Sequence, residues 1–420
     1  MAEKKAFLGF EPLASSVNKG SLLIYDFNAT GHCPSWLSLA TGAFVGRCDN
    51  ITVACQCEAR SMDGWQKRIY DNANTVIPIA DRPLQSHLTD ALRLANSVNA
   101  ESILFPNLDS VLYDLGSQIR KGAITSSDLS GDQRIAGIWL RPQIFETEPS
   151  VCERIWSKLN RSPEGKLHRR LLRTKWSNLC ALRALAEVDR LAQVTFFFTD
   201  PREIERSFPL FNKVRRRLIC DPWLAKSDLN QALARERLNL PKNKVVILHA
   251  GTSRPEKGLK NLCQAMKQLL PEQQQDLLLY RVGQVEPTDQ PELQALIKKK
   301  LACAVERYVS DDELLTAYAA CDWVALPYRD QAESSGILVH AAAHQRPVLV
   351  SDFGLIGEWT RQFGLGLVFA HKDVADLSLK LSELTQSDNG AFPGLIKFAN
   401  MHTAASFQQS LTNDWWYMTD

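Results

Sequence analysis

Short apolar runs alternate with stretches of helical spacing along most of this chain. In the first half, each apolar run is short enough for a strand and is bounded by turn residues. The pattern predicts strands at residues 22–25, 51–54, 75–79, 102–105 and 135–140, and helices at residues 35–41 and 87–99. A repeated strand-helix rhythm implies a parallel sheet with helices on its faces. The first half is therefore predicted to be an α/β domain.

The second half begins with the same pattern and adds features of a phosphate site. Residues 245–248 are an apolar run typical of a buried parallel strand, and Gly251 then lets the backbone turn. A helix is predicted from Pro255, with apolar residues at helical spacing down one face. Arg254 and Lys257 stand beside this helix start, where backbone N–H groups and the helix dipole attract anions. The same residues also fit a strand-turn-helix unit with solvated cations.

A second segment, residues 312–352, reads as helix, strand, polar loop, helix, strand. Its strand, residues 323–326, is followed by the polar loop at residues 328–336. Ligands of open α/β sheets bind beyond the carboxyl ends of the strands, so this loop is expected to form part of a site. Ser334, Ser335 and Gly336 open the next helix, whose first N–H groups can receive phosphate or sugar hydroxyls.

At these two segments the chain resembles the retaining glycosyltransferases of family 4, which have the GT-B fold and take sugars from nucleotide donors. The resemblance implies that Arg254 and Lys257 hold the donor diphosphate, and that loop amides from Ser334 to Ile337 hold phosphate and sugar. It also implies retention of anomeric configuration, no obligatory metal, and no cofactor beyond the nucleotide sugar, UDP- or GDP-linked. The motifs that carry it are G-x-x-R-P-x-K-G at residues 251–258, D-D-E-L-L-x-x-Y-A-A-C-D-W-V, S-S-G-I-L and R-P-V-L-V-S-D.

The GT-B fold implied by this resemblance is an α/β architecture. It has two Rossmann-like, doubly wound parallel-sheet domains that face a cleft, with a C-terminal helix that crosses back to the first domain. We expect the acceptor on the N-terminal domain and the nucleotide sugar on the C-terminal domain.

The chain departs from that family at a pair of glutamates separated by seven residues. His340 takes the place of the second glutamate, which contacts the nucleotide ribose, and Ala332 takes the place of the first, beside the transferred sugar. Glu333 and Asp330 are close enough in sequence for a small loop shift to restore a carboxylate, and Glu333 is the candidate catalytic residue. His340 can make one hydrogen bond with a ribose hydroxyl where a carboxylate makes two. It fits equally well as a helix histidine that meets only backbone or water.

Candidates in the first half come from the same resemblance. The loop after the first strand is expected to face the cleft, which makes Gly31 and His32 candidates for contact with donor phosphate or acceptor. Asn107 and Asp109 follow the strand at residues 102–105 and are candidates for acceptor contact. Each has a structural alternative, because His32 also fits a helix-capping or exposed residue, and Asn107 and Asp109 fit ordinary turn residues.

The positions of prolines and the spacing of apolar residues indicate the domain boundaries. We predict an acceptor-side domain at residues 1–220, a linker at 221–242, a nucleotide-sugar-binding domain at 243–395, and a C-terminal helix at 396–420. In the resembled family the last helix packs back on the first domain. Trp415 and Trp416 are expected to be packing anchors there, although an exposed tryptophan can stack on a sugar.

Composition and charge exclude several classes of function. The 420 residues include 49 Lys and Arg against 47 Asp and Glu, a net charge of +2 that is too balanced to imply nucleic acid as a partner. Ten cysteines lack the spacing of a disulfide framework or a zinc site, and no apolar run is long enough for a signal peptide or a membrane span. A cytoplasmic location is expected. Basic clusters at residues 161–175 and 213–217 either contact anionic lipid weakly or are solvated helix faces.

These observations predict a glycosyltransferase that moves a sugar from a nucleotide diphospho-sugar to a glycan, lipid-linked or small-molecule acceptor. Arg254 and Lys257 would stabilise the charge that develops on the leaving diphosphate. Two alternatives stay open. One is a GT-B enzyme of another type, such as a sugar-nucleotide epimerase or phosphorylase, and the other is a catalytically silent binding or scaffold protein.

Overall fold

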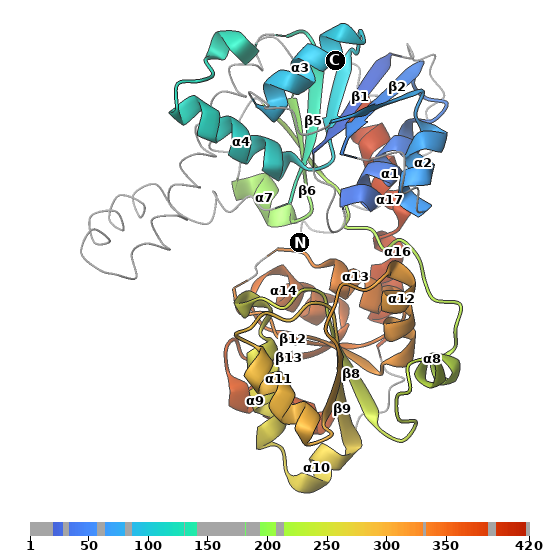
Figure 1. Ribbon diagram of the computed structural model, residues 1–420, viewed down its shortest axis with the longest axis vertical. Coiled ribbons are helices and arrows are strands. Elements are labelled where there is room, and N and C mark those ends of the chain that lie inside the picture. Colours follow the sequence, from blue (N-terminus) through green and yellow to red (C-terminus); the bar gives the residue numbers. More distant parts are fainter. Residues whose placement is uncertain are drawn as a thin grey trace, which may run out of the picture.

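The computed structural model has two parallel sheets, one in each half of the chain, stacked along the long axis (Figure 1). Every strand pairing in both sheets is parallel. The predicted pair of α/β domains is thereby confirmed. The structure describes residues 20–27, 33–56, 64–79, 86–129, 131–140, 181, 194–206, 214–330, 333–384 and 392–416.

The N-terminal sheet has seven described strands in the order β3-β2-β1-β4-β5-β6-β7. All five strands predicted for the first half are present, within a residue or two at each end. The strands are β1 (Ser21–Asp26), β2 (Asn50–Cys55), β3 (Thr75–Pro78), β4 (Ser102–Phe105), β5 (Arg134–Trp139), β6 (Val194–Phe198) and β7 (Arg215–Leu218). The described helices of this domain are α1 (Cys33–Phe44), α2 (Gly64–Asn72), α3 (His87–Ser97), α4 (Leu108–Arg120) and α7 (Pro201–Arg206), with a 3₁₀ turn at Ser126–Leu129.

The C-terminal sheet has six described strands in the order β10-β9-β8-β11-β12-β13. They are β8 (Val245–Ala250), β9 (Leu277–Val282), β10 (Ala302–Val305), β11 (Trp323–Leu326), β12 (Val348–Ser351) and β13 (Gly366–Phe369). The helices are α8 (Gln231–Arg237), α9 (Leu259–Gln268), α10 (Pro271–Asp276), α11 (Gln290–Lys298), α12 (Asp311–Ala320), α13 (Gly336–Ala343), α14 (Gly354–Phe363), α15 (Val374–Glu383), α16 (Gly394–Met401) and α17 (Ala404–Leu411). Short helical turns lie at Pro255–Lys257 and Thr412–Trp416.

Both sheets are buried on both faces, which explains the continuous apolar runs of their strands. In β8, Val246 and Leu248 enter one apolar cluster, while Ile247, which points the opposite way, enters another. Leu22 and Leu23 of β1 divide in the same way between the two clusters of the N-terminal domain. Each domain therefore has helices packed on both sides of its sheet, as the doubly wound fold requires.

Each sheet reverses its strand order at one place, between β1 and β4 and between β8 and β11. At such a switch point the loops after the two strands run in opposite directions and leave a crevice, which is where ligands of doubly wound folds bind. The segments at residues 251–258 and 328–336 follow β8 and β11. The sheet order therefore places both predicted segments at one crevice.

The chain crosses between the domains twice, and the two crossings are hydrogen-bonded to each other. The Trp223 N–H donates to the His402 carbonyl at 2.9 Å, and the His402 ring Nδ1 donates to the Asp221 carbonyl at 3.0 Å. Helix α17 then packs against α1 of the N-terminal domain, where Phe407 meets Trp36 edge-on at 5.3 Å between ring centroids (Figure 1). The predicted return of the chain end to the first domain is confirmed.

Several local predictions need correction. No α-helix begins at Pro255; residues 255–257 form a 3₁₀ turn, and α9 begins only at Leu259, because Gly258 adopts a left-handed conformation that ends the turn. The C-terminal apolar stretch is two helices broken at His402, and α16 packs on α13 and α14 of the C-terminal domain. Of the predicted linker, residues 231–237 form α8, which packs against α12.

The basic cluster near residue 215 is part of a strand. Arg215, Arg216 and Arg217 belong to β7, which among the described strands pairs only with β6 and so lies at the sheet edge. Charged side chains on an edge strand oppose pairing with another chain, so the cluster has a structural explanation that helical spacing did not suggest. The other basic cluster, at residues 161–175, lies outside the described residues.

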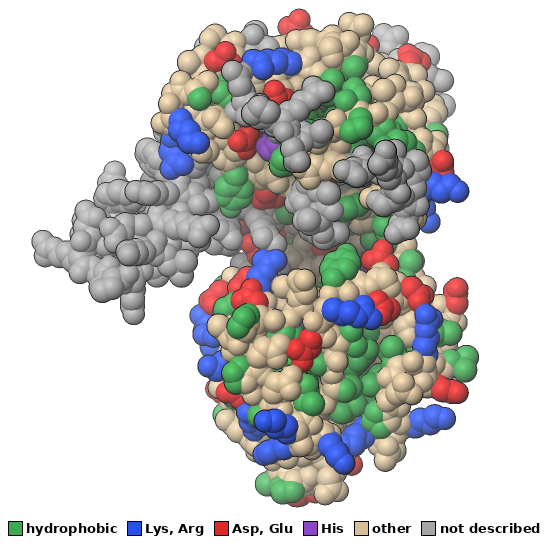
Figure 2. All heavy atoms as spheres, in the orientation of Figure 1, with side chains coloured by type: hydrophobic (Ala, Val, Ile, Leu, Met, Phe, Trp, Pro, Cys, Tyr) green, Lys and Arg blue, Asp and Glu red, His purple; other side chains and the backbone are tan. Residues whose placement is uncertain are grey.

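None of the described helices combines the length and the hydropathy that a membrane crossing needs. Figure 2 shows basic and acidic side chains intermixed on the visible face of the C-terminal domain.

Candidate functional site

The turn at residues 255–257 packs tightly on the end of β11. Gly258 has φ +71°, and a Cβ there would lie 1.9 Å from the Pro327 carbonyl oxygen. The Arg329 N–H donates to the Glu256 carbonyl at 2.8 Å, which fixes the turn to the loop after β11. Only glycine fits at position 258, and the R-P-x-K-G motif is therefore the sequence of one turn held against one neighbouring strand.

Tyr328 joins the two segments that the sequence singled out. Lys257 Nζ lies 3.9 Å from the centroid of the Tyr328 ring, a cation–π contact. The Tyr328 hydroxyl is 3.1 Å from Ser335 Oγ. Both Tyr328 and Ser335 are buried, at 3% and 4% exposure, so this link is sheltered from water. The structure thus brings Lys257 and the start of α13 to one place.

Arg254 lies at the surface beside this turn. Its side chain is 46% exposed, and Nη1 is 3.6 Å from Glu256 Oε1. An exposed ion pair of this length contributes little to stability, so it costs little to exchange Glu256 for a ligand. Arg329, from the loop after β11, adds a third cation, and its buried Nε has no hydrogen-bond partner among the described residues.

His249 supports the turn from below. It is 1% exposed, and its Nε2 donates to the Lys257 carbonyl at 3.3 Å. Burial, with the charge of Arg281 as a second cause, lowers the pKa of His249 to about 3. The ring is therefore neutral at pH 7 and acts as a fixed hydrogen-bond donor beneath Lys257.

The start of α13 faces the N-terminal domain. Ser334 Oγ donates to Thr199 Oγ1 at 3.2 Å, which joins the two domains directly. A Cβ at Gly336 would lie 3.7 Å from Asp221 Oδ2, so the carboxyl group of the crossing segment sits near the first turn of α13. Burial raises the pKa of Asp221 to about 7. Ser335 is the N-cap residue but makes no side-chain cap, which leaves the first N–H groups of the helix, from Gly336 and Ile337, without a side-chain acceptor.

Two further contacts join the domains. Arg202, after β6, reaches Glu358 of α14 at 3.4 Å. The Trp65 indole N–H donates to Asp311 at 2.9 Å. The two domains are therefore held together by several side-chain contacts.

His340 lies one turn inside α13 and stacks on Tyr318, with 5.7 Å between ring centroids and 17° between planes. Burial lowers the pKa of His340 to about 4, so the ring is neutral at pH 7. Its Nδ1 is buried without a partner among the described residues. A neutral imidazole with one open ring nitrogen can make one hydrogen bond with a hydroxyl, and the predicted ribose contact stays a prediction.

The carboxylate candidates of the loop differ in their surroundings. Asp330 is bound to Lys372 Nζ at 2.8 Å, which draws it outward. Glu333 is half-buried and has no hydrogen-bond partner among the described residues. Ala332 lies outside the described residues. Of the two carboxylates, Glu333 is the one that can turn toward a sugar, and this role stays a prediction.

In the N-terminal domain, both described candidates have local roles. Asn107 Oδ1 accepts from the Ser110 N–H and caps α4, and Asp109 Oδ2 accepts from the Leu140 N–H at 3.0 Å. These contacts fit the turn-residue alternative, and contact with an acceptor stays a prediction. Gly31 and His32 lie outside the described residues.

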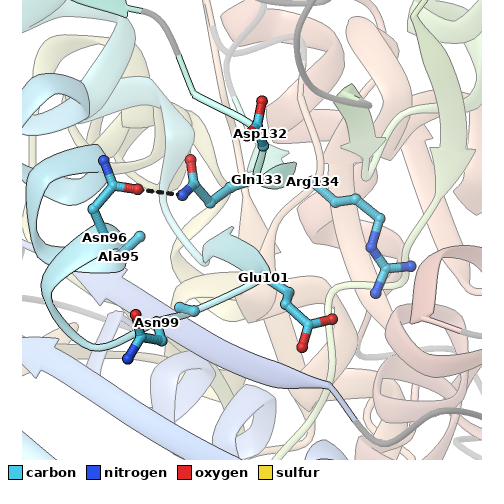
Figure 3. Close-up of a pocket in the computed structure, with 8 residues that line it drawn as sticks. Ala95, Asn96, Asn99, Glu101, Asp132, Gln133 and Arg134 are labelled. Atoms are coloured by element: carbon cyan, nitrogen blue, oxygen red, sulfur yellow. Dashed lines mark hydrogen bonds between the residues drawn. The ribbon is translucent and has the colours of Figure 1, made fainter.

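The N-terminal domain has a polar hollow on the side of its sheet where the strands begin. Figure 3 shows Asn96 and Gln133 facing each other across it, joined by a hydrogen bond of 2.6 Å. Glu101 and Gln133 of its lining come directly before β4 and β5, so the hollow is at the amino ends of the strands. Ligands of doubly wound sheets bind at the carboxyl ends, which separates this hollow from the cleft.

Sequence reasoning missed Tyr328, Arg329 and Thr199. Tyr328 and Arg329 lie inside the loop predicted to form a site, and their signal was their place directly after a strand and a proline. Thr199 had no comparable signal, because its contact with Ser334 depends on how the two domains meet.

Comparison with known proteins bears on the family and the fold of the chain. The family model described as Glycosyl transferases group 1 matches residues 230–391. A GDP-mannose:glycolipid 4-beta-D-mannosyltransferase of Xanthomonas campestris pv. campestris is 31% identical over 157 residues. That match covers 36% of this chain and 43% of the relative, so it spans less than half of either protein.

Solved structures match over nearly the whole chain. HepE of Anabaena, in complex with UDP-glucose, has a TM-score of 0.64 at 15% identity and covers 95% of this chain and 100% of its own. Sucrose-phosphate synthase of Thermosynechococcus elongatus has a TM-score of 0.64 at 16% identity, with 95% and 98% covered. WaaG, a glycosyltransferase involved in lipopolysaccharide biosynthesis, has a TM-score of 0.61 at 12% identity, with 94% and 98% covered. Residues 230–391 thus match the glycosyl transferases group 1 family, within a chain that has the GT-B fold.

Proposed function

We propose that this protein is a glycosyltransferase that moves a sugar from a nucleotide diphospho-sugar to an acceptor held mainly by the N-terminal domain. The observation that carries the proposal is the convergence at the switch point of the C-terminal sheet. There the turn with Arg254 and Lys257 meets the start of α13 through Tyr328. Two cations and an uncapped helix start at one crevice fit a diphosphate with a sugar beside it.

Each residue has a chemical role in this proposal. Arg254, Lys257 and Arg329 stabilise the negative charge that develops on the leaving diphosphate, and charges aimed in this way often contribute more to catalysis than any other effect. Gly251 leaves the backbone open to the phosphates, since a Cβ there would meet nothing within 4 Å. The N–H groups from Ser334 to Ile337 hold phosphate and sugar. Glu333 contacts the transferred sugar, and His340 makes one hydrogen bond to the ribose.

Stereochemistry and metal use follow from the same arrangement. We propose that the chain belongs to family 4. As in that family, transfer would retain the anomeric configuration of the sugar. The three cations neutralise the diphosphate without a metal ion. The donor is UDP- or GDP-linked. This choice is supported by a relative named for GDP-mannose and a similar structure that binds UDP-glucose.

The acceptor is a glycan or a lipid-linked sugar, a class supported by the glycolipid named in the mannosyltransferase relative. We propose a cytoplasmic enzyme that works at the membrane surface, with weak contact through basic residues. Binding to vesicles with and without anionic lipid tests this contact, and equal binding to both would contradict it.

The first experiment is calorimetric titration with UDP, GDP, ADP and dTDP, followed by hydrolysis of the sugar form of whichever binds. The double variant Arg254→Ala, Lys257→Ala should lose binding and at least about 100-fold in turnover, because one lost donor alone typically costs that much. Lys298→Ala, in α11 away from the crevice, is a control for the loss of one surface lysine. Binding that persists unchanged in the double variant would contradict the assigned diphosphate site.

A catalytically silent binding protein is the second candidate, favoured by His340 in place of a glutamate. It predicts nucleotide binding with no sugar release. The turn around Gly258 and the link through Tyr328 count only against a scaffold that binds no ligand, since such a protein has no use for aligned cations. Hydrolysis assays distinguish the two directly, and analysis of the products separates transfer from epimerase or phosphorylase chemistry.

A further inference from the structure

A fully buried arginine lies beneath the turn that carries Arg254 and Lys257. Arg281, in β9, is 0% exposed, and no carboxylate of the described residues forms an ion pair with it. Its guanidinium instead donates to backbone carbonyls at the ends of β8 and β9 and in the loops that follow them. These belong to His249 at 3.0 Å, Gln284 at 2.8 Å, Val282 and Gly251. A buried arginine is ordinarily paired with an acid, so this arrangement needs an explanation.

The loops after β8 and β9 pack closely around this guanidinium. Gly251 and Gly283 have φ +94° and +118°, and a Cβ at Gly283 would lie 2.4 Å from the Gly251 carbonyl oxygen. The Ser253 N–H donates to the Gln284 carbonyl at 2.8 Å, and Ser253 Oγ donates to Asp289 at 2.7 Å. Arg281 therefore fixes the backbone from which the Arg254 and Lys257 turn begins.

The partial charges of backbone carbonyl groups explain why a positive charge is useful at the ends of β8 and β9. The four carbonyl oxygens around Arg281 each carry partial negative charge, and such a cluster without a cation would repel an anion. A guanidinium at their centre reverses the sign of the local field. Burial lowers the pKa of Arg281 to about 10, and the group stays protonated at pH 7. In a low-dielectric interior such a charge is screened less than a surface charge.

We infer that Arg281 is a positioning residue of the donor site, whose buried charge makes the carbonyl-lined ends of β8 and β9 attractive to the diphosphate of a nucleotide. The inference rests on the proposed function and adds to it a residue that does not contact the ligand. It acts through the carbonyls it binds and through its field.

Two substitutions separate the charge from the hydrogen bonds. Arg281→Lys keeps the charge with fewer donors, and Arg281→Gln keeps two N–H donors without the charge. Arg346→Gln is the matched control, because Arg346 also donates to carbonyls, of Tyr318 at 3.1 Å and Ala319 at 2.7 Å. It precedes β12, so it lies at the amino ends of the strands of the same sheet, opposite the crevice.

Calorimetry measures binding of UDP, GDP, uridine, guanosine and inorganic pyrophosphate at a temperature where thermal unfolding shows each variant to be folded. We expect Arg281→Gln to weaken diphosphate and pyrophosphate binding about 10-fold or more, equivalent to about 1.4 kcal/mol. Nucleoside binding should stay within about twofold by the same measure. Arg281→Lys should fall between Arg281→Gln and the unchanged protein, and Arg346→Gln should match the unchanged protein.

Equal losses in the lysine and glutamine variants, or a parallel loss of nucleoside binding, would show a purely structural role and overturn the inference. Pyrophosphate binding that depends on Arg281, without binding of any nucleoside diphosphate, would support the inference and overturn the proposed donor. Diphosphate binding that is unchanged in Arg281→Gln would leave the proposed function standing and reject the inference. If the unchanged protein binds neither probe, both are rejected.

Discussion

Replacing Gly258 by alanine tests how tightly the cation-bearing turn packs on β11. The new Cβ would lie 1.9 Å from the Pro327 carbonyl oxygen and 2.9 Å from its carbon. Both atoms belong to backbone, which cannot rotate away as a side chain can. Pro327 is followed by Tyr328, which holds Lys257 and Ser335, so any shift spreads into the site.

Two separate costs contribute to the expected loss of stability. A left-handed conformation costs a non-glycine residue about 1–2 kcal/mol. Forcing an extra methyl group into a packed region costs a further amount of about 1–3 kcal/mol. The predicted loss is therefore about 2–5 kcal/mol, a large part of the roughly 5–15 kcal/mol that stabilises an ordinary domain.

Gly364→Ala isolates the first cost, that of the left-handed conformation. Gly364 ends α14 in the same domain with φ +65°, and a Cβ there would meet nothing within 4 Å. This variant should lose only the conformational part, about 1–2 kcal/mol. Urea unfolding of both variants gives the difference, and calorimetry with the bound nucleotide gives the effect on the site. Equal stability losses in the two variants, or donor affinity that is unchanged in Gly258→Ala, would refute the reasoning.

Three further predictions follow from contacts elsewhere. Tyr328→Phe keeps the ring beneath Lys257 but removes the hydrogen bond to Ser335, so it should lower stability by about 0.5–1.5 kcal/mol. Tyr328→Leu removes the ring as well and should also weaken donor binding in calorimetry. Equal donor affinity in the two variants would contradict the role of the ring. Burial lowers the pKa of His402 from 6.5 to about 4. The unfolded chain therefore takes up a proton first as pH falls below 6.5, and about 2 kcal/mol of stability should be lost between pH 7 and pH 5. His402→Gln should lose less over that range in urea unfolding, and an identical pH dependence would contradict this. Trp415→Ala should cost about 3–5 kcal/mol because the ring is buried against Phe44, and a Tm unchanged in calorimetric scanning would contradict that packing.

The sequence by itself determined the strands and the chemistry of the turns. Strands that are buried on both faces need unbroken apolar runs, and this local requirement located β1 to β5, β8, β11 and β12. Local chemistry also explains Gly258 within the R-P-x-K-G motif, because a left-handed conformation favours glycine whatever the turn packs against. Residue types at fixed spacing also pointed to Arg254, Lys257 and the start of α13.

Only the tertiary structure decided which of these parts meet. The link from Lys257 through Tyr328 to Ser335 exists because β8 and β11 are neighbours at the switch point, and strand order is not encoded in local spacing. The same reason applies to Thr199, which reaches Ser334 only when the two domains face each other. The edge position of Arg215 in β7 depends on pairing with β6, which overrode the expectation of a helix face. Arg281 looked like any cation in the sequence, and its role depends on the buried carbonyls that surround it, because burial is a property of the whole fold.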